Sequence, residues 1–549
     1  MKLVKSLLLG SAAGLVAAAG AQAADLPTRK AAPVDYVRIC AVHGPGFFYI
    51  PGSDTCIRIG GRARFEYVYS QAYNKTTDPS SFNATARLIL DARTQTDFGL
   101  LRAYARIDIS RNSGNDYFGS GSGARGGTKF GYLGGGNTPA PVFASFAGAD
   151  TIGNRLQTGV GLTTAFVQWG GLTAGRLQSF FDFYADNDTW FGITDSDVTT
   201  QALAYTYTFG NGFSATLSIE DPKERQKYPI SGVGPIAAGG INPSSLTGLG
   251  TPGANFNITY PFAFSPFAAP YVSSISYTQR ENVPDVVGVL NVTQGWGSAQ
   301  LSGAYHRIET GGSTITNLQL NNTGTALITN PLVSTVSGGY GTKTGNGWAV
   351  QAGVKFNLPM IAAGDYVYLQ AAYSKGDLSY ANSGNPGSWQ GLAYGIGRTT
   401  FASYDAVVGP GGRLTLTPAW SALISYEHYW TPTIRQGVFA GVYHVEYSSA
   451  IRSAAGFAMG AACPTCLGTV ALSTGALYNP FNPYYDGGYQ YNIGTNLIWS
   501  PVKDLDIGVE VMYLRNDMQH KQFDIQNRGR GVVSSDDVWV SRLRVQRDF

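Results

Sequence analysis

Charged residues are scarce in this chain: they make up 13% of its 549 residues, and the net charge is only +3. No basic run is long enough to follow a phosphate backbone, so we expect no nucleic-acid partner. Long apolar runs are also missing, because beyond residue 23 no stretch approaches the roughly 20 apolar residues that a membrane-spanning helix needs. The sequence therefore excludes a helical membrane protein.

Histidine is rare as well, and the five histidines are scattered along the chain. They are His43, His306, His428, His444 and His520. No two of them have the spacing of a zinc-binding pair such as the HExxH helix motif. The glycine-rich stretch at residues 119–136 lacks the lysine and the strand-helix context of a phosphate-binding loop. We therefore expect neither a metal nor a cofactor.

The first residues have the composition of an export signal. Lys2 and Lys5 precede an apolar stretch at residues 7–19 and a small-residue site at residues 21–23. This pattern predicts a cleavable signal over residues 1–23 and a mature chain that starts at Ala24. A membrane-anchoring helix is the alternative, but it needs roughly 20 apolar residues, and this run is shorter and rich in glycine and alanine.

Glycine and aromatic residues are abundant, with 71 Gly, 33 Tyr and 27 Phe, and this composition suits strands and turns. The clearest strand signal is an alternation of polar and apolar residues with a period of two. In residues 57–69, the apolar face carries Ile57, Ile59, Gly61, Ala63, Phe65, Tyr67 and Tyr69, and the opposite face carries Arg58, Gly60, Arg62, Arg64, Glu66 and Val68. Residues 82–93 and 489–499 alternate in the same way, over the length of a tilted membrane-crossing strand.

The connections between these strands fall into two classes. Seven are short, at residues 94–98, 170–171, 210–212, 295–297, 357–364, 431–434 and 501–504. Eight are long and polar, at residues 70–81, 111–156, 177–198, 221–284, 307–345, 375–415, 448–488 and 516–537. With both chain ends on the side of the short turns, these connections imply sixteen strands. An even strand number with this asymmetry is typical of bacterial outer-membrane barrels, whose sheet must close because lipid cannot satisfy an open edge.

We therefore predict an all-β fold, a closed antiparallel transmembrane β-barrel of sixteen strands over residues 57–549, with long external loops. Its expected location is the outer membrane of a Gram-negative cell, with membrane lipid around it. The last strand, residues 538–549, ends in Phe549, and an aromatic residue there suits the membrane interface. A soluble propeller or sandwich is the alternative, but no repeat of about 40 residues supports a propeller.

One long segment, residues 178–198, combines acidic and aromatic residues. Its acids are Asp182, Asp186, Asp188, Asp195 and Asp197, and they lie among phenylalanine, tyrosine and tryptophan residues. Such aromatic content is unusual for a loop in solvent, so we predict that the segment folds into the lumen, packs against the wall and constricts the pore. Its acids, chiefly Asp182, Asp186 and Asp188, would then face the pore. An external loop packed against its neighbours is the alternative.

Arginines on the first strands are expected to supply the opposing charge. Pairing across the turn at residues 94–99 predicts Arg87 opposite Arg106, and Asp91 opposite Arg102 as a structural ion pair. If the 70–81 loop is symmetric, Arg64 falls opposite Arg87. Arg64, Arg87 and Arg106 would then form one row that faces the lumen. Like charges side by side on a sheet are destabilising, so this row is tolerable only where water and counter-charges are near.

The predicted basic side of the constriction includes Arg62, Arg64, Arg87 and Arg106, and Arg542 and Arg544 of the last strand lie beside the first two. Facing the acidic loop, these arginines would create a transverse field that orders polar solutes and biases ion choice. The alternative is a set of solvated wall charges with no special role.

Four cysteines form two local pairs in the sequence. Cys40 and Cys56 flank a turn region in residues 24–56, a segment that we place in the periplasm, and they suit a disulfide in an oxidising compartment. Cys463 and Cys466 have the spacing of a redox or metal half-site. With no second cysteine pair and no histidine close in sequence, a local disulfide is the better interpretation.

Two groups of short motifs resemble a known family. Residues 36–40 (YVRIC), 46–52 (GFFYIPG) and 55–58 (TCIR) form the opening with the paired cysteines, and residues 172–176 (LTAGR) with 179–182 (SFFD) lead into the predicted constriction. These stretches resemble the alphaproteobacterial outer-membrane porins, over nearly the whole mature chain. The resemblance implies a homotrimer of sixteen-stranded barrels, passive diffusion of small hydrophilic solutes and ions, and a third loop inside each pore. From this motif we add Arg176 to the basic side.

Functions other than that of a general-diffusion porin are also compatible with the sequence. A substrate-selective channel is one alternative, and an adhesin or receptor role in the external loops 221–284 and 448–488 is another. A barrel enzyme would need a nucleophile and a base together. His306 is expected near a rim and His444 on a lumen face, but no serine or acid can be assigned to them, so we expect no enzyme.

Overall fold

The computed structural model describes most of the barrel-forming chain. The described residues are 38–71, 79–112, 158–225, 282–315, 343–383, 413–462, 485–524 and 531–549, with shorter pieces at 151–152, 155–156, 231–232, 275–280, 318–320, 327–329, 336–337, 389–390, 401–402, 404–408, 467–473 and 477–481. The predicted signal at residues 1–23, the pair Cys463 and Cys466, and most of loop 221–284 lie outside the described residues.

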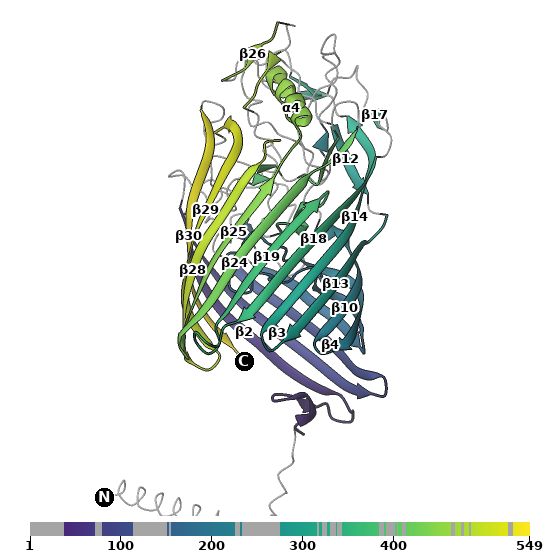
Figure 1. Cartoon of the computed structure of the whole chain (residues 1–549), viewed down its shortest axis with the longest axis vertical. Coiled ribbons are helices and arrows are strands. Elements are labelled where there is room, and N and C mark those ends of the chain that lie inside the picture. Colours follow the sequence, from purple (N-terminus) through teal and green to yellow (C-terminus); the bar gives the residue numbers. More distant parts are fainter. Residues whose placement is uncertain are drawn as a thin grey trace, which may run out of the picture. The chain divides into compact units, whose positions relative to one another are not determined.

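Sixteen strands form one closed antiparallel sheet (Figure 1), as the alternation predicted. They are β2 (Cys56–Ser70), β3 (Ser80–Thr96), β4 (Gly99–Asn112), β7 (Thr158–Trp169), β8 (Leu172–Gln178), β9 (Thr199–Gly210), β10 (Phe213–Glu220), β13 (Asp285–Gln294), β14 (Gly297–Ile315), β18 (Thr344–Asn357), β19 (Tyr366–Lys375), β24 (Pro418–Thr431), β25 (Ile434–Val445), β28 (Gly488–Val502), β29 (Leu505–Phe523) and β30 (Val532–Asp548). Each pairs with the next, and β30 pairs back with β2, with Ser70 opposite Val540. The closed ring leaves no strand edge for lipid to meet.

Shorter elements lie in the connections. The short strands are β1 (Phe48–Tyr49), β5 (Thr151–Ile152), β6 (Arg155–Leu156), β11 (Ser231–Gly232), β12 (Ile275–Arg280), β15 (Leu318–Leu320), β16 (Leu327–Thr329), β17 (Val336–Ser337), β20 (Trp389–Gln390), β21 (Phe401–Ala402), β22 (Ala406–Val408), β23 (Leu414–Leu416), β26 (Val470–Ala471) and β27 (Leu477–Tyr478). The helical pieces are η2 (Ala41–His43), η3 (Pro222–Glu224), η4 (Leu378–Tyr380) and α4 (Ser449–Ala462). Helix α4 stands where the sequence predicted only a loop. Within the described ranges, every helix is too short or too polar to cross a membrane.

The two faces of the wall differ as the alternation predicted. Phe65, Leu203 and Leu217 point outward and are 43%, 45% and 62% exposed, whereas Glu66 and Ala204, which follow the first two, are 3% and 2% exposed. Each strand thus turns its apolar side chains toward the membrane and its polar side chains toward the lumen.

All seven predicted short connections are present, and the one after β9 shows why glycine is needed there. Asn211 and Gly212 both have a positive φ, of 52° and 81°. A side chain on Gly212 would place its Cβ 1.9 Å from the Thr293 carbonyl oxygen of the neighbouring strand. The turn therefore requires glycine at this position.

The described residues 38–58 belong to a separate compact unit. The predicted disulfide joins Cys40 to Cys56, with the Cα atoms 6.0 Å apart. Both cysteines are buried with Phe47, and the Arg58 guanidinium lies 5.4 Å from the centre of the Phe47 ring. The disulfide and this small apolar cluster hold the unit together.

Two strands run further than the sequence suggested. Strand β14 continues to Ile315 and β29 to Phe523, into segments expected to be loop. Pairing explains the extra length, because β12 adds to the far part of β14 and β30 pairs with β29 as far as Phe523.

Candidate pore constriction

Residues 179–198, between β8 and β9, form a segment that we call the inner loop. Its ends are held together where the Ser179 N–H donates to the Val198 carbonyl at 2.9 Å. Phe181 and Tyr184 are buried, with exposed fractions of 0% and 1%. These side chains pack against the interior of the barrel, so the predicted inward fold is confirmed.

The first part of the inner loop is anchored to the wall by hydrogen bonds. The Phe181 carbonyl accepts from Ser302 Oγ on β14 and from Gln351 Nε2 on β18, both at 2.9 Å. The Tyr184 N–H donates to Gln370 Oε1 on β19 at 2.9 Å. Irregular chain buried inside a barrel needs such partners, because no strand ladder satisfies its backbone groups.

The later part of the inner loop is anchored on the far side of the barrel. The N–H groups of Trp190 and Phe191 both donate to the Glu510 carboxylate on β29, each at 2.9 Å. On β30, the guanidinium of Arg544 lies 4.2 Å from the Trp190 ring centre, and that of Arg542 lies 4.3 Å from the Phe191 ring centre. These cation–π contacts fix the loop beside the arginines of the last strand.

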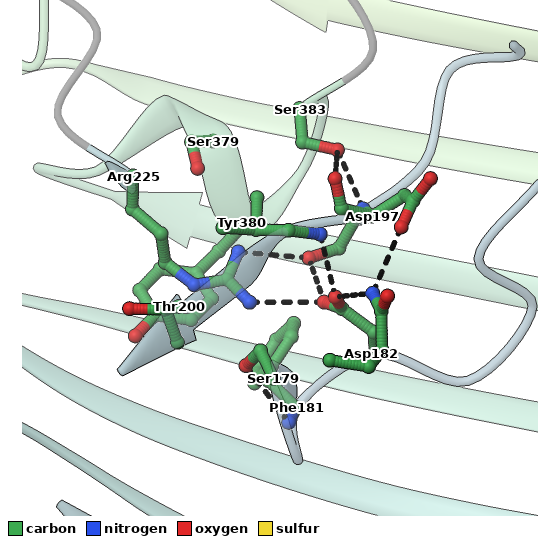
Figure 2. A network of polar contacts seen from close by, with 12 residues as sticks. Ser179, Phe181, Asp182, Asp197, Thr200, Arg225, Ser379, Tyr380 and Ser383 are labelled. Atoms are coloured by element: carbon green, nitrogen blue, oxygen red, sulfur yellow. Dashed lines mark hydrogen bonds and ion pairs between the residues drawn. The ribbon is translucent and has the colours of Figure 1, made fainter. Parts of the chain in front are cut away.

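Asp182 forms a buried ion pair with Arg225, the residue that follows η3 (Figure 2). The Asp182 Oδ1 to Arg225 Nη2 distance is 2.9 Å, and the two side chains are 0% and 1% exposed. Asp182 also accepts hydrogen bonds from Gln178 Nε2, Ser196 Oγ and the Val198 N–H. Its carboxylate is therefore fully engaged inside the base of the loop.

Asp186 and Asp188 are also engaged. The Asp186 carboxylate accepts the Ile193 N–H at 2.9 Å, across the turn that the loop makes. Asp188 accepts Tyr366 Oη at 2.7 Å and Ser425 Oγ at 2.5 Å, and it is only 5% exposed. The side chains expected to face the pore are thus turned toward donors in the loop and the wall, chiefly because those buried donors need acceptors.

Burial, and after it crowding by other carboxylates, raises the pKa values of three acids of the inner loop, Asp186, Asp195 and Asp197. Burial, and after it the nearby Asp197 carboxylate, raises the pKa of Asp186 to about 8. Burial and Asp186 raise the pKa of Asp195, and burial and Asp182 raise that of Asp197. A proton bound to Asp186 lowers the negative charge of the loop at neutral pH.

Six arginines line the lumen on β2, β3, β4 and β30; we call them the basic wall. They are Arg62, Arg64, Arg87, Arg106, Arg542 and Arg544. Glu66 lies 2.7 Å from Arg544 and 3.2 Å from Arg542, Asp108 lies 2.6 Å from Arg87 and 2.8 Å from Arg106, and Asp548 lies 2.5 Å from Arg62. Five of the six guanidinium groups thus share three carboxylates, and the sixth, that of Arg64, donates to Gln546 Oε1 at 2.9 Å. The arginines of the basic wall therefore outnumber the carboxylates that pair with them.

The predicted register of β3 and β4 is wrong by two residues. Arg87 lies opposite Asp108 rather than Arg106, and Asp91 lies opposite Tyr104 rather than Arg102. The reason is the turn, which closes tightly with Thr96 opposite Gly99. Asp91 and Arg102 still form the predicted ion pair, at 2.9 Å, because a shift of two residues preserves the face.

The predicted pairing of Arg64 with Arg87 is wrong as well. The Ser70 N–H donates to the Pro79 carbonyl at 2.7 Å, so β2 and β3 pair two residues away from the predicted register. Further along, Asn83 Nδ2 donates to Glu66 Oε2 at 3.2 Å. Arg64 therefore does not lie opposite Arg87.

Two residues expected inside the barrel lie on its outward face. Arg176 is opposite Gln201, on the face that carries the exposed Leu203, and it pairs with Glu224 at 2.7 Å. His444 shares the outward face of β25 and stacks on Tyr489 at 4.3 Å between ring centres. Arg176 is consequently removed from the basic side of the constriction.

Several residues of the site were missed by the sequence analysis. Arg225 lies in a long external segment with no periodic pattern, and its partner Asp182 is 43 positions away. Glu510 and Asp108 stand on predicted strands, on the lumen face, and the alternation could have singled them out as interior acids. Their partners depend on register, which the alternation does not fix.

A closed sixteen-stranded barrel with an apolar exterior, a polar lumen and a loop folded inside is a channel of the outer membrane. The family model described as "Porin subfamily" matches residues 25–541, so the chain belongs to this porin family. It is an outer-membrane channel for passive diffusion, and the family indicates a channel rather than an enzyme.

Relatives and solved structures carry related names. Porin Omp2b of Brucella suis biovar 1 (strain 1330) is 28% identical over 387 residues, which cover 67% of this chain and 84% of that protein. Porin Omp2a of Brucella ovis is 32% identical over 248 residues, 43% of this chain and 66% of that protein. Among solved structures, the outer membrane channel DcaP of Acinetobacter baumannii is 14% identical with a TM-score of 0.48, over 91% of this chain and 99% of that one.

Proposed function

We propose that the basic wall and the inner loop form the constriction of this channel, and that the channel passes small hydrophilic anions more readily than cations. The observation that carries the proposal is the charge balance of the basic wall, in which five arginines share three carboxylates and Arg64 pairs with the neutral Gln546. A lumen with one sign of excess charge concentrates ions of the other sign.

The state of the acids supports the same direction. Asp182 is neutralised by Arg225, and Asp188 is enclosed by Tyr366 and Ser425. The raised pKa of Asp186, about 8, lowers its charge further at neutral pH. The transverse field predicted from the sequence is thus weakened on its acidic side, while the basic side keeps its charge.

The test is the reversal potential of the purified channel in a planar bilayer under a salt gradient. We expect the wild-type sign to report anion selectivity, and Arg87→Gln to move the potential toward cation selectivity. Arg176→Gln is the matched control, because it removes the same charge from the outward face. A cation-selective wild type, or equal shifts in both variants, would contradict the proposal.

A substrate-selective channel is distinguished in the same bilayer. A selective channel shows current block by its solute at low concentration, whereas a general-diffusion channel shows conductance that scales with salt and no such block. We propose the general-diffusion behaviour, since family membership supports it and Asp182, Asp186 and Asp188 are occupied in holding the loop.

We also propose the homotrimer and the processing that the sequence implied. Membership in the porin family supports three barrels side by side in outer-membrane lipid, and native mass spectrometry of the purified channel tests the number. Cleavage before Ala24 is tested by amino-terminal sequencing of the mature protein. Residues 24–56, with their disulfide, would then lie in the periplasm.

A further inference from the structure

Three side chains that can bind a metal converge at one buried point outside the constriction. Asp285 is the first residue of β13, His306 lies in β14, and Asp377 follows the end of β19 by two residues. His306 Nδ1 is 2.6 Å from Asp285 Oδ1 and 3.6 Å from Asp377 Oδ2. The three side chains are 0–1% exposed, and one ligand atom from each lies within 4.8 Å of the others.

The fold brings these distant residues together by register and by close backbone packing. In the β13–β14 pair, Val286 lies opposite Tyr305, so one residue further from the turn that joins these strands Asp285 lies opposite His306. His306 is also opposite Gly347 of β18. A Cβ on Gly376, which has φ +93°, would lie 3.0 Å from the Gly347 Cα, so only two glycines allow Asp377 to approach this closely.

Two atoms of the cluster have no hydrogen-bond partner although they are buried. They are Asp377 Oδ2 and His306 Nε2. The other carboxylate oxygens are satisfied, because Asp285 Oδ2 accepts from Tyr380 Oη at 2.7 Å and Asp377 Oδ1 accepts the Ser379 N–H at 3.0 Å. Surrounding donors therefore orient both carboxylates and leave one oxygen of Asp377 facing the histidine.

A protonated histidine explains the cluster poorly. One imidazolium supplies a single positive charge at Nδ1 for the two carboxylates that approach this nitrogen. A divalent cation with a neutral imidazole and two carboxylates makes the group electrically neutral, which suits full burial.

We propose that Asp285, His306 and Asp377 bind a divalent transition-metal ion, with Zn²⁺ the best match. Zinc takes imidazole nitrogen and carboxylate oxygen at about 2.0–2.2 Å in a tetrahedral arrangement, which sets neighbouring ligand atoms about 3.3 Å apart. The 3.6 Å between His306 Nδ1 and Asp377 Oδ2 is close to this spacing. His306 Nδ1 and Asp285 Oδ1 are 2.6 Å apart, so Asp285 Oδ1 would have to move by about 0.7 Å to bind the same ion. Calcium and magnesium prefer all-oxygen sites, so the histidine disfavours them.

The proposed site would act as a clamp near the inner loop. Tyr380, which donates to Asp285, packs its ring 4.6 Å from that of Phe181 and 4.0 Å from the Arg225 guanidinium. An ion at this point would link β13, β14 and the segment after β19. Tyr380 of that segment contacts Phe181 and Arg225 at the base of the inner loop. The inference does not depend on the anion preference.

The test uses the full-length mature protein, purified in detergent, stripped with EDTA, equilibrated with Zn²⁺ and freed of unbound metal. Inductively coupled plasma mass spectrometry should find a single zinc ion per chain in the wild type and little in His306→Asn or Asp377→Asn. His428→Asn is the matched control. His428 Nδ1 lies 2.7 Å from Asp365 Oδ2, and the described residues add no third metal-binding side chain to that pair.

A second readout keeps the test independent of folding defects. Heat-modifiable migration on gels shows whether each variant is folded, and Asp377→Asn changes the side-chain shape least. Added Zn²⁺ should raise the unfolding temperature of the wild type and of His428→Asn but not of Asp377→Asn. The proposal is overturned if the wild type holds no more zinc than His306→Asn, or if zinc stabilises folded Asp377→Asn equally.

Discussion

Replacing Arg225 with methionine should loosen the base of the inner loop without unfolding the barrel. The substitution leaves the Asp182 carboxylate buried with neutral partners only, and breaking a buried ion pair in this way costs about 3–5 kcal/mol. It also removes the cation–π contact at 4.0 Å with Tyr380, a contact of about 2 kcal/mol when desolvated. The two losses overlap, so we expect about 3–5 kcal/mol in all.

Single-channel recording is the assay, because a loosened inner loop changes the constriction directly. We expect Arg225→Met to show larger open-channel current noise and a changed mean conductance, while heat-modifiable gel migration stays that of a folded barrel. Arg515→Met is the control: its ion pair with Asp517 is exposed, and such pairs contribute about 0–1 kcal/mol.

A double-mutant cycle makes the argument refutable. If the buried charge of Asp182 is the cause, Asp182→Asn should restore much of what Arg225→Met loses, with a coupling energy of about 1–3 kcal/mol in thermal or denaturant unfolding. Additive effects of the two substitutions, or wild-type noise in Arg225→Met, would refute the reasoning.

Two further predictions concern the other contacts of the inner loop. Glu510→Gln removes the charge of the acceptor for the N–H groups of Trp190 and Phe191, which weakens each hydrogen bond by about half. We therefore expect larger open-channel current noise, as for Arg225→Met. Noise equal to that of the wild type would show that Glu510 does not anchor the loop. The folded chain keeps a proton on Asp186 up to a pKa of about 8, whereas the unfolded chain releases it near the ordinary value of 3.8, so stability should fall as pH rises between these values and level off above 8. Unfolding temperatures of Asp186→Asn should depend less on pH in that window, and an unchanged profile would exclude the group.

Much of the fold could be predicted from the sequence because alternation assigns each residue to a face without any knowledge of its partners. Arg62 and Arg64 were placed in the lumen on this basis, and Phe65 outside it. Pairing partners are a different matter. The contact of Arg87 with Asp108 depends on where one turn closes, at Thr96 and Gly99, and a shift of two residues leaves every face unchanged.

The site was harder to predict where its residues do not belong to regular strands. Arg225 acts through a segment without periodicity, so nothing local distinguishes it from an exposed arginine. Arg176 was assigned by motif rather than by alternation. Leu172 lies four residues before Arg176 on the same strand and points outward, so alternation places Arg176 on the outward face as well. The motif alone does not contain this information.

The acids of the inner loop also show why an acidic sequence need not make an acidic pore. A loop inside a barrel buries N–H groups that no strand pairs with, and carboxylates are strong acceptors for them. Asp182 accepts the Val198 N–H, and Asp186 accepts the Ile193 N–H. Glu510, on the wall strand β29, accepts the N–H groups of Trp190 and Phe191. The arginines of the basic wall, by contrast, stand on strands whose backbone is already paired, and they outnumber the carboxylates that pair with them. We therefore expect the ion selectivity of this channel to depend on which side of the constriction uses its charge to hold the chain in place.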